Sequence, residues 1–262
     1  MLFTELPLLE RPAAAAAAGF SAVEYWWPFP SAIPSDREVD AFVTAIQDAG
    51  VALAGLNFFA GDMPGGDRGV VSWPERGPEF RDNVDVTVGI GERLGCRAFN
   101  ALYGNRIEGV DPHEQDELAA MNLALAGRAA ARIGGTVLLE PVSGAPRYPI
   151  RTAADAVAVI DRVDSQSGVD NIGFLCDLYH LAVNGDDLDK VIAQYGDRVA
   201  HVQIADAPGR GEPGTGQLDL PRYLNDLEAR GYRGWVGLEY KPTTSTDESL
   251  DWLPRSLRSL GR

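Results

Sequence analysis

Short apolar runs alternate with longer segments of helical periodicity along the chain, and this alternation restricts the possible folds more than any other feature. Seven runs have the length and apolar character of buried strands, and they cover residues 20–25, 51–58, 97–103, 136–140, 172–177, 200–205 and 235–240. Strands that alternate with helices in this way form parallel sheets joined by right-handed crossovers. The pattern therefore predicts an α/β protein.

The segments between these runs have the spacing of amphipathic helices. Val39, Phe42, Val43 and Ile46 recur at helical intervals in one of them. Helices are expected at residues 36–49, 114–133, 152–163, 220–230 and 248–260. The alanine run at residues 13–18 is typical of a helix that leads into the first visible strand.

The order of these elements points to a barrel. No linker rich in proline, glycine and serine divides the chain, so we expect a single TIM-barrel domain over residues 1–262. A (β/α)8 TIM barrel has eight strands, one more than the visible runs. The additional strand should precede the first helix, where the chain offers only Met1–Glu5. We therefore expect the first strand to be short or missing at the N-terminus.

Charge and composition exclude several classes of protein. The formal net charge is −15, and no basic patch of the kind that binds nucleic acid is visible. No stretch approaches the roughly 20 apolar residues that span a membrane, and the alanine run lacks the basic start of a signal peptide. Cys96 and Cys176 do not form a metal-type pair, which indicates a reducing compartment. We expect a cytoplasmic protein.

Four successive strands end in a polar side chain after an apolar run. These side chains are Glu140, Asp177, Gln203 and Glu239, each separated from the next by about one βα unit. The carboxyl ends of neighbouring barrel strands converge on the mouth of the barrel, where active sites lie. Three carboxylates and an amide oxygen predict a site for Mg²⁺ or Mn²⁺. The alternative is that each residue only caps its own strand.

Further residues near the predicted mouth are candidates for binding a substrate. His180 follows Asp177 at a strand-to-helix turn, where its imidazole could hold a substrate oxygen. Residues 209–214 fit the pattern G-x-G-x-x-G, but Pro213 lacks the backbone N–H that a phosphate cradle needs. We interpret this segment as a barrel loop that brings the cation of Arg210 toward the metal.

The second visible strand ends at Asn57 and is followed by a long loop over residues 63–78 that contains Arg68. Loops of this length are usually functional or mobile. The sequence leaves open whether the loop is a lid over the site or a surface excursion, and it makes Asn57 and Arg68 candidates for substrate binding.

Several motifs together resemble a known family. They are Asn57, Ala60–Asp62, Arg68-Gly69, Glu79–Asp82, Glu140-Pro141, Asp177–His180, His201–Asp206, Arg210–Gly216 and Gly237–Tyr240. Over Met1 to about Thr243 the chain is similar to the hydroxypyruvate isomerase family, a branch of the xylose-isomerase-like barrels. The block from Gln203 to Gly216 is the most specific part. Related ketose epimerases and endonuclease-IV-like enzymes usually have a histidine at the position of Gln203.

The resemblance implies an intramolecular oxidoreductase of the aldose–ketose isomerase type that interconverts hydroxypyruvate and tartronate semialdehyde, within glyoxylate metabolism. It implies that Glu140 and Glu239 are the proton-moving pair, and that Asp177 and Gln203 occupy metal-ligand positions shared across the superfamily. The family has a first strand upstream of the segment that matches Met1–Phe3. The absence of that strand here would leave an open edge next to the strand that carries Glu239.

These expectations define a mechanism. One glutamate removes a proton from C3 of the substrate and the other returns one at C2, through an enediolate. His180 is expected to help move the hydroxyl proton. The substrate carboxylate needs a cation, for which Arg210 is the first candidate and Arg68, Arg106 and Lys241 are the second.

The partner is thus expected to be a small anionic hydroxy-carbonyl acid, with no nucleic acid and no membrane. Three alternatives stay open. The first is an isomerase or epimerase of a related sugar acid such as 2-oxo-tetronate, and the second is a non-catalytic binding protein that keeps the metal pocket. The third is a phosphodiesterase acting on DNA, which would need more metal-ligating histidines than the three in this sequence. The sequence also leaves open whether the chain forms a homo-oligomer.

Overall fold

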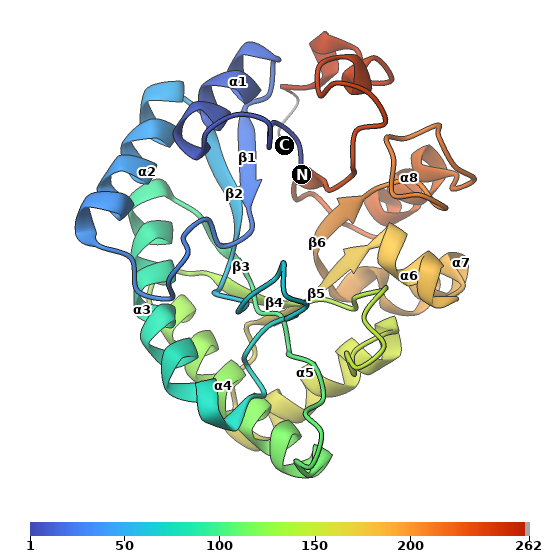
Figure 1. The fold of residues 1–262 in the computed structure, drawn as a ribbon. Coiled ribbons are helices and arrows are strands. Elements are labelled where there is room, and N and C mark those ends of the chain that lie inside the picture. Colours follow the sequence, from blue (N-terminus) through green and yellow to red (C-terminus); the bar gives the residue numbers. More distant parts are fainter. Residues whose placement is uncertain (260–262) are drawn as a thin grey trace.

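The computed structural model describes residues 1–259, and its centre is a seven-stranded parallel sheet surrounded by helices (Figure 1). The strands are β1 (Ala22–Tyr25), β2 (Ala52–Asn57), β3 (Ala98–Asn100), β4 (Thr136–Leu139), β5 (Ile172–Asp177), β6 (Val199–Ile204) and β7 (Val236–Leu238), and they lie in chain order across the sheet. Each of the seven predicted runs therefore contains a strand. Every neighbouring pair is parallel, which confirms the TIM-barrel prediction.

Helices connect the strands and cover the outside of the sheet. The α-helices are α1 (Arg11–Ala17), α2 (Asp36–Ala49), α3 (Gly77–Leu94), α4 (Pro112–Ala131), α5 (Ala153–Ser167), α6 (Leu178–Asn184), α7 (Leu188–Tyr195) and α8 (Leu220–Ala229). Short 3-10 helices are η1 (Leu8–Glu10), η2 (Pro74–Arg76), η3 (Gly196–Arg198), η4 (Glu248–Leu250) and η5 (Arg255–Leu257). Helices were correctly predicted in the regions of α1, α2, α4, α5 and α8.

The helix predicted at residues 248–260 is wrong. The segment instead forms the two short 3-10 helices η4 and η5. Pro254 lies between them, and proline lacks the N–H of a helical hydrogen bond and restricts the residue before it. The predicted end of this helix, Leu260, lies outside the described residues.

Capping residues explain where the helices α2, α5 and α6 begin. Ser35 and Glu38 form a capping box at the start of α2, and Thr152 and Asp155 form one at the start of α5. Asp177 is the N-cap residue of α6, because one of its carboxylate oxygens accepts hydrogen bonds from the backbone N–H groups of Tyr179 and His180. This cap fixes the position of Asp177 at the end of β5.

The two edge strands of the sheet, β1 and β7, line one cavity, and residues 1–4 line it as well. The backbone N–H of Phe3 donates to Oγ1 of Thr246 at 3.2 Å. Phe3 packs there with Ala15, Ala18 and Leu250 in a small apolar cluster. Within residues 1–259 the sheet has seven strands. The prediction of a single domain over residues 1–262 stays a prediction, and its last three residues lie outside the described part of the chain.

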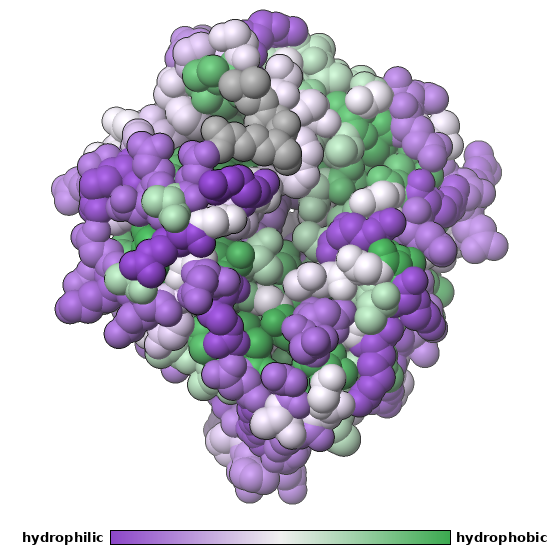
Figure 2. Space-filling view, turned by 180° about the vertical axis from the view of Figure 1, so that it is seen from behind, coloured by the Kyte–Doolittle hydropathy of each residue, from purple (hydrophilic) through white to green (hydrophobic). Residues whose placement is uncertain are grey.

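The surface agrees with the acidic composition of the chain. Figure 2 shows hydrophilic side chains over most of one face of the molecule, with hydrophobic residues mainly toward its middle and along one upper side. Among the described residues, none of the helices combines the length and hydrophobicity that crossing a membrane requires.

Candidate active site

A row of buried polar side chains follows the carboxyl ends of six neighbouring strands. They are Asn57, Asn100, Glu140, Asp177, Gln203 and Glu239, and all are at most 6% exposed. The strand register places Asn57 beside Asn100 and Asp177 beside Gln203. Because parallel strands bring their carboxyl ends to the same edge, residues far apart in sequence form one polar site there.

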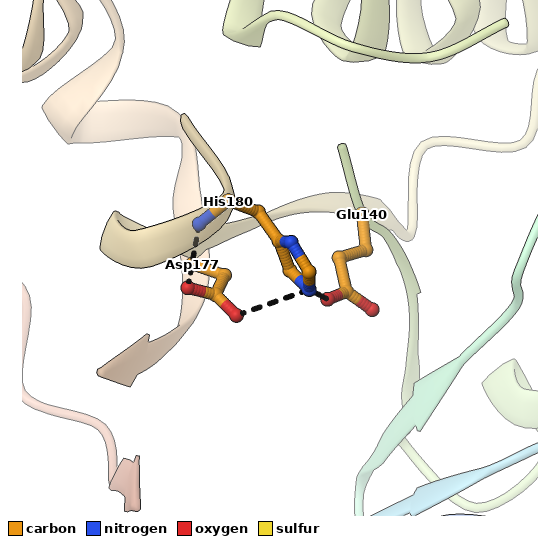
Figure 3. A group of neighbouring side chains, drawn as sticks. All are labelled: Glu140, Asp177 and His180. Atoms are coloured by element: carbon orange, nitrogen blue, oxygen red, sulfur yellow. Dashed lines mark hydrogen bonds and ion pairs between the residues drawn. The ribbon is translucent and has the colours of Figure 1, made fainter. Parts of the chain in front are cut away.

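Glu140, Asp177 and His180 form the centre of this site (Figure 3). One possible ligand atom from each of the three lies within 4.8 Å of the others. Nε2 of His180 is 3.7 Å from Oε1 of Glu140 and 3.7 Å from Oδ2 of Asp177. The sequence prediction that these three residues act in the site therefore agrees with their positions, while their chemical roles stay predictions.

The hydrogen bonds of His180 indicate which of its nitrogens carries the proton. The backbone N–H of Ser143 donates to Nδ1 at 3.0 Å, so Nδ1 is the acceptor of the ring. Burial, and then the charge of Arg210, lower the pKa of His180 to about 4. At neutral pH the ring is therefore neutral, with its N–H at Nε2 directed toward Glu140 and Asp177. It can donate a hydrogen bond to a substrate oxygen.

Glu239 has one occupied and one free oxygen. Its Oε1 accepts from Nε1 of Trp26 at 3.0 Å and from Nη2 of Arg210 at 2.7 Å. Glu140 is held similarly, because Nδ2 of Asn100 donates to its Oε2 at 2.6 Å. Each glutamate is thus fixed through one oxygen, and the other oxygen remains available to a ligand or a proton.

Burial makes the three carboxylates harder to ionise, and neighbouring negative charges add to this effect. Burial and the charges of Glu239 and Asp177 raise the pKa of Glu140 well above its usual value. Burial also raises the pKa of Glu239, although Arg210 opposes this shift, and burial raises the pKa of Asp177 to about 6. A divalent cation among these oxygens would remove the repulsion and favour the ionised forms.

The unsatisfied atoms of the site fit such a cation. Among the described residues, Oδ2 of Asp177, Oε1 of Gln203 and Oε2 of Glu239 are buried and have no hydrogen-bond partner. Buried polar atoms are rarely left without a partner. Carboxylate and amide oxygens are the ligands of Mg²⁺ and Mn²⁺, so the donor set is suitable for the predicted metal.

Arg210 reaches the site from a loop that Asp206 organises. The carboxylate of Asp206 accepts hydrogen bonds from the backbone N–H groups of Ala207, Gly214 and Leu218. Arg210 has a left-handed backbone conformation with φ of 62°, which is uncommon for a residue other than glycine. Its guanidinium stacks over the ring of Tyr179 at 5.3 Å while it pairs with Glu239. The loop interpretation of residues 209–214 therefore agrees with the structure.

The other predicted binding residues have different positions. Asn57 lines a cavity of about 690 Å³ that also contacts Gln203 and Glu239. The side chain of Arg68 donates hydrogen bonds to the backbone oxygens of Met63 and Asp67. Its positive charge contributes to the lowered pKa of His180.

The two remaining cation candidates are Arg106 and Lys241. Within the described part of the chain, neither side chain pairs with a carboxylate of the site. The side chain of Arg106 pairs with Asp116 at 2.7 Å, and Lys241 is exposed. Within the long loop, Val70, Val71 and Ser72 are buried, so this part of the loop belongs to the core.

Sequence reasoning did not find several residues of the site. Trp26 and Asn100 hold the two glutamates, and Ser143 orients His180. Asn100 was detectable in principle, because it lies at the end of a strand beside Asn57. Glu24 was also missed, although its Oε1 accepts from Nε2 of Gln203 at 3.0 Å.

Glu24 remains ionised in spite of its surroundings. Burial alone would raise its pKa, but the charge and hydrogen bond of His201 and the hydrogen bond from Gln203 hold the pKa below its usual value. Nε2 of His201 donates to Oε2 of Glu24 at 2.7 Å. Glu24 is therefore an anion that contacts the amide nitrogen of Gln203.

We expect the metal-free protein to lose stability as the pH rises from about 4 to 7. The folded state raises the pKa of Asp177 from 3.8 to about 6, so it binds a proton more tightly than the unfolded state. This contribution to stability is complete below the unfolded pKa and is lost as the pH rises through 6, and Glu140 and Glu239 act in the same direction. For Asp177 alone the effect is about 3 kcal/mol.

The measurement is the melting temperature in the presence of a chelator across this pH range. Asp177→Asn is the matched control, because an asparagine oxygen can still cap α6 but does not titrate. The variant should show a smaller fall in melting temperature with pH. A slope as steep as that of the wild type would show that Asp177 does not contribute to it.

Comparisons with known proteins identify the family of the chain. A family model described as a xylose isomerase-like TIM barrel matches residues 12–256. A Streptomyces coelicolor protein with the provisional name hydroxypyruvate isomerase is 57% identical, and the match covers 99% of this chain and 95% of that protein. The hydroxypyruvate isomerase of Escherichia coli is 31% identical, with 97% of this chain and 95% of that protein covered.

Two further matches are to proteins with names other than hydroxypyruvate isomerase. The 2-oxo-tetronate isomerase of Cupriavidus necator is 32% identical, and the match covers 97% of this chain and 94% of that protein. A crystal structure described as an AP endonuclease, family 2, from Brucella melitensis superposes with a TM-score of 0.86 and 36% identity, covering 96% of this chain and 94% of the other.

Proposed function

Because the chain belongs to the xylose isomerase-like TIM barrel family, we propose that it is an isomerase that interconverts hydroxypyruvate and tartronate semialdehyde. The observation that carries this proposal is the pair Glu140 and Glu239, both buried, both with raised pKa values and both on one polar site. Two carboxyl groups with raised pKa values are suited to giving and taking protons near neutral pH. The relatives named as hydroxypyruvate isomerases supply the reaction and the substrate.

We propose that Asp177, Gln203, Glu140 and Glu239 hold Mg²⁺ or Mn²⁺. When bound, such a cation would polarise the substrate carbonyl and make the adjacent protons more acidic. One glutamate removes a proton from C3 of hydroxypyruvate, and the other delivers a proton to C2 of the resulting enediolate. The hydroxyl proton passes from the oxygen on C3 to the oxygen on C2, so that the aldehyde forms at C3. The Nε2–H group of His180 donates a hydrogen bond to the substrate oxygen on which negative charge develops.

Arg210 is the proposed partner of the substrate carboxylate. It is the cation that directly contacts the catalytic pair, through Glu239, and its stacking on Tyr179 holds the guanidinium in place. Arg68 adds positive charge on the side of His180. A planar guanidinium can bind a carboxylate through two parallel hydrogen bonds, which fixes the orientation of the substrate.

We expect Arg210→Met to raise the KM for hydroxypyruvate by about 10- to 100-fold, because a charge-assisted hydrogen bond contributes about 1.5–3 kcal/mol. The measurement compares hydroxypyruvate with dihydroxyacetone, which has the same hydroxymethyl ketone but no carboxylate. Arg106→Met is the control, since Arg106 pairs with Asp116. An equal loss with both substrates would contradict a role in binding the carboxylate.

The proposed function is tested by turnover. The purified protein is incubated with hydroxypyruvate, with and without Mg²⁺ or Mn²⁺, and the aldehyde product is measured. A parallel panel contains 2-oxo-tetronate and free sugars. Faster turnover of the four-carbon acid would favour the second candidate, which the relative from Cupriavidus necator supports. Metal binding without proton exchange in any candidate would support a binding protein instead.

We place this activity in the cytoplasm and in glyoxylate metabolism, with no nucleic-acid partner. The formal charge of −15 opposes binding to a phosphate backbone. The histidines also argue against a multi-histidine metal centre. Of the three in the sequence, His113 is exposed and His201 is paired with Glu24.

A further inference from the structure

The side-chain amide of Gln203 lies near two sets of carboxylates, and either set could accept a hydrogen bond from its NH₂ group. On one side are the carboxylates of the site, since Gln203 neighbours Asp177 in the strand register. On the other side is Glu24, whose Oε1 accepts from Nε2 of Gln203 at 3.0 Å. The amide oxygen is buried and, among the described residues, has no hydrogen-bond partner. The amide therefore has a defined direction, with nitrogen toward Glu24 and oxygen toward the site.

Glu24 is the group that imposes this direction. An ionised carboxylate can only accept hydrogen bonds, so it must face the NH₂ group of the amide. The carboxylates of Asp177 and Glu239 would attract the same NH₂ group if Glu24 were not there. Turned that way, Gln203 would present hydrogen-bond donors to the site and could not bind a cation.

The surroundings of Glu24 hold its carboxylate in this place. Nε2 of His201 donates to Oε2 at 2.7 Å, so that each carboxylate oxygen has one partner. Gly237 in β7 leaves the space that the carboxylate of Glu24 occupies, because a Cβ atom there would lie 2.2 Å from Oε1 of Glu24. A Cβ atom at Gly55 would lie 3.4 Å from Oε2, which is an ordinary contact.

We propose that Glu24 is a positioning residue that turns the amide oxygen of Gln203 toward the site and thereby gives the site its affinity for a divalent cation. This inference rests on the proposed metal site, but it requires neither a particular substrate nor catalytic turnover. Groups that orient metal ligands typically change metal affinity by 10- to 100-fold when they are replaced.

The test measures the dissociation constant of Mn²⁺ by electron paramagnetic resonance of the free ion, with no substrate present. Glu24→Met removes the acceptor, and Gly237→Ala displaces the carboxylate while keeping its charge. Both should weaken Mn²⁺ binding at least tenfold. Glu24→Gln removes the charge and leaves one amide oxygen for the two donors, Gln203 and His201, so it keeps the orientation only in part. It should weaken Mn²⁺ binding less than Glu24→Met does, and Gly55→Ala should stay within about threefold of the wild type.

The four variants separate orientation from charge and from stability. Equal weakening in Glu24→Met and Glu24→Gln would attribute the effect to the lost charge and overturn the proposal. So would unchanged binding in Gly237→Ala, or a wild-type protein that does not bind Mn²⁺. Melting temperatures identify any variant that is merely unfolded, and the remaining variants then decide. If the wild type binds Mn²⁺ as described but does not isomerise hydroxypyruvate, the proposed function fails and this inference stands.

Discussion

Replacing Glu140 or Glu239 by glutamine should slow proton exchange between hydroxypyruvate and solvent by about 10²- to 10⁴-fold, which is the usual contribution of a general acid or base. Glutamine has the shape of glutamate but cannot carry the transferred proton. The fold should remain intact, because the contacts of Asn100 with Glu140 and of Trp26 with Glu239 can also be made to an amide oxygen. The measurement is deuterium incorporation at C2 and C3, followed by nuclear magnetic resonance in heavy water.

The melting temperature of the same two variants is a second measurement. Each removes one buried charge from a group of mutually repelling carboxylates, so the metal-free variants should melt at a higher temperature than the wild type at pH 7.5. Glu92→Gln on the exposed face of α3 is the matched control and should change neither quantity. Unchanged exchange in either site variant would remove that glutamate from the mechanism. Loss of exchange at only one carbon would assign the two glutamates to their separate steps.

Removing divalent cations should reduce turnover of hydroxypyruvate by about 10³-fold or more, since a metal ion supplies several kcal/mol of charge stabilisation. Initial rates would be measured after dialysis against a chelator and after re-addition of Mg²⁺ or Mn²⁺. Added Mn²⁺ should also raise the melting temperature more at pH 7.5 than at pH 5.5, because protonated Asp177 binds it poorly.

Asp177→Asn serves as the control for this experiment, because it should require much more Mn²⁺ for the same rate. Full activity of the wild type in excess chelator would contradict the metal site. It would not by itself exclude an isomerase, since Arg210 and the Nε2–H group of His180 also face the substrate region.

Local sequence patterns predicted the strands and the polar residues that end them. A strand followed by a carboxylate is visible within a few residues, and the order of the strands in a parallel barrel then brings Glu140, Asp177 and Gln203 to one edge. The partners of these residues were not predictable in this way. Trp26 contacts Glu239 across 213 positions, and Glu24 contacts Gln203 across 179. Such pairs form because the sheet curves until β1 lies near β6 and β7, and no local pattern contains this curvature.

The missed and misplaced helices have local causes. The helix α3 begins with Gly77 and Pro78 and contains Gly89 and Gly91, which weaken its apolar periodicity. Gly91 is required by packing, because a Cβ atom there would lie 2.3 Å from the ring of Phe99. The erroneous helix at residues 248–260 shows the opposite case, since its apolar spacing is adequate but Pro254 interrupts it.

The hydrogen bond from Trp26 to Glu239 has a practical consequence. Trp26 is 41% exposed, yet its indole N–H group donates to Oε1 of Glu239 at 3.0 Å. The emission of an indole depends on the charge and the water around it. Trp26 is one of five tryptophans, so the difference in emission between the wild type and Trp26→Phe would report the entry of an ion or a substrate beside Glu239 without any label.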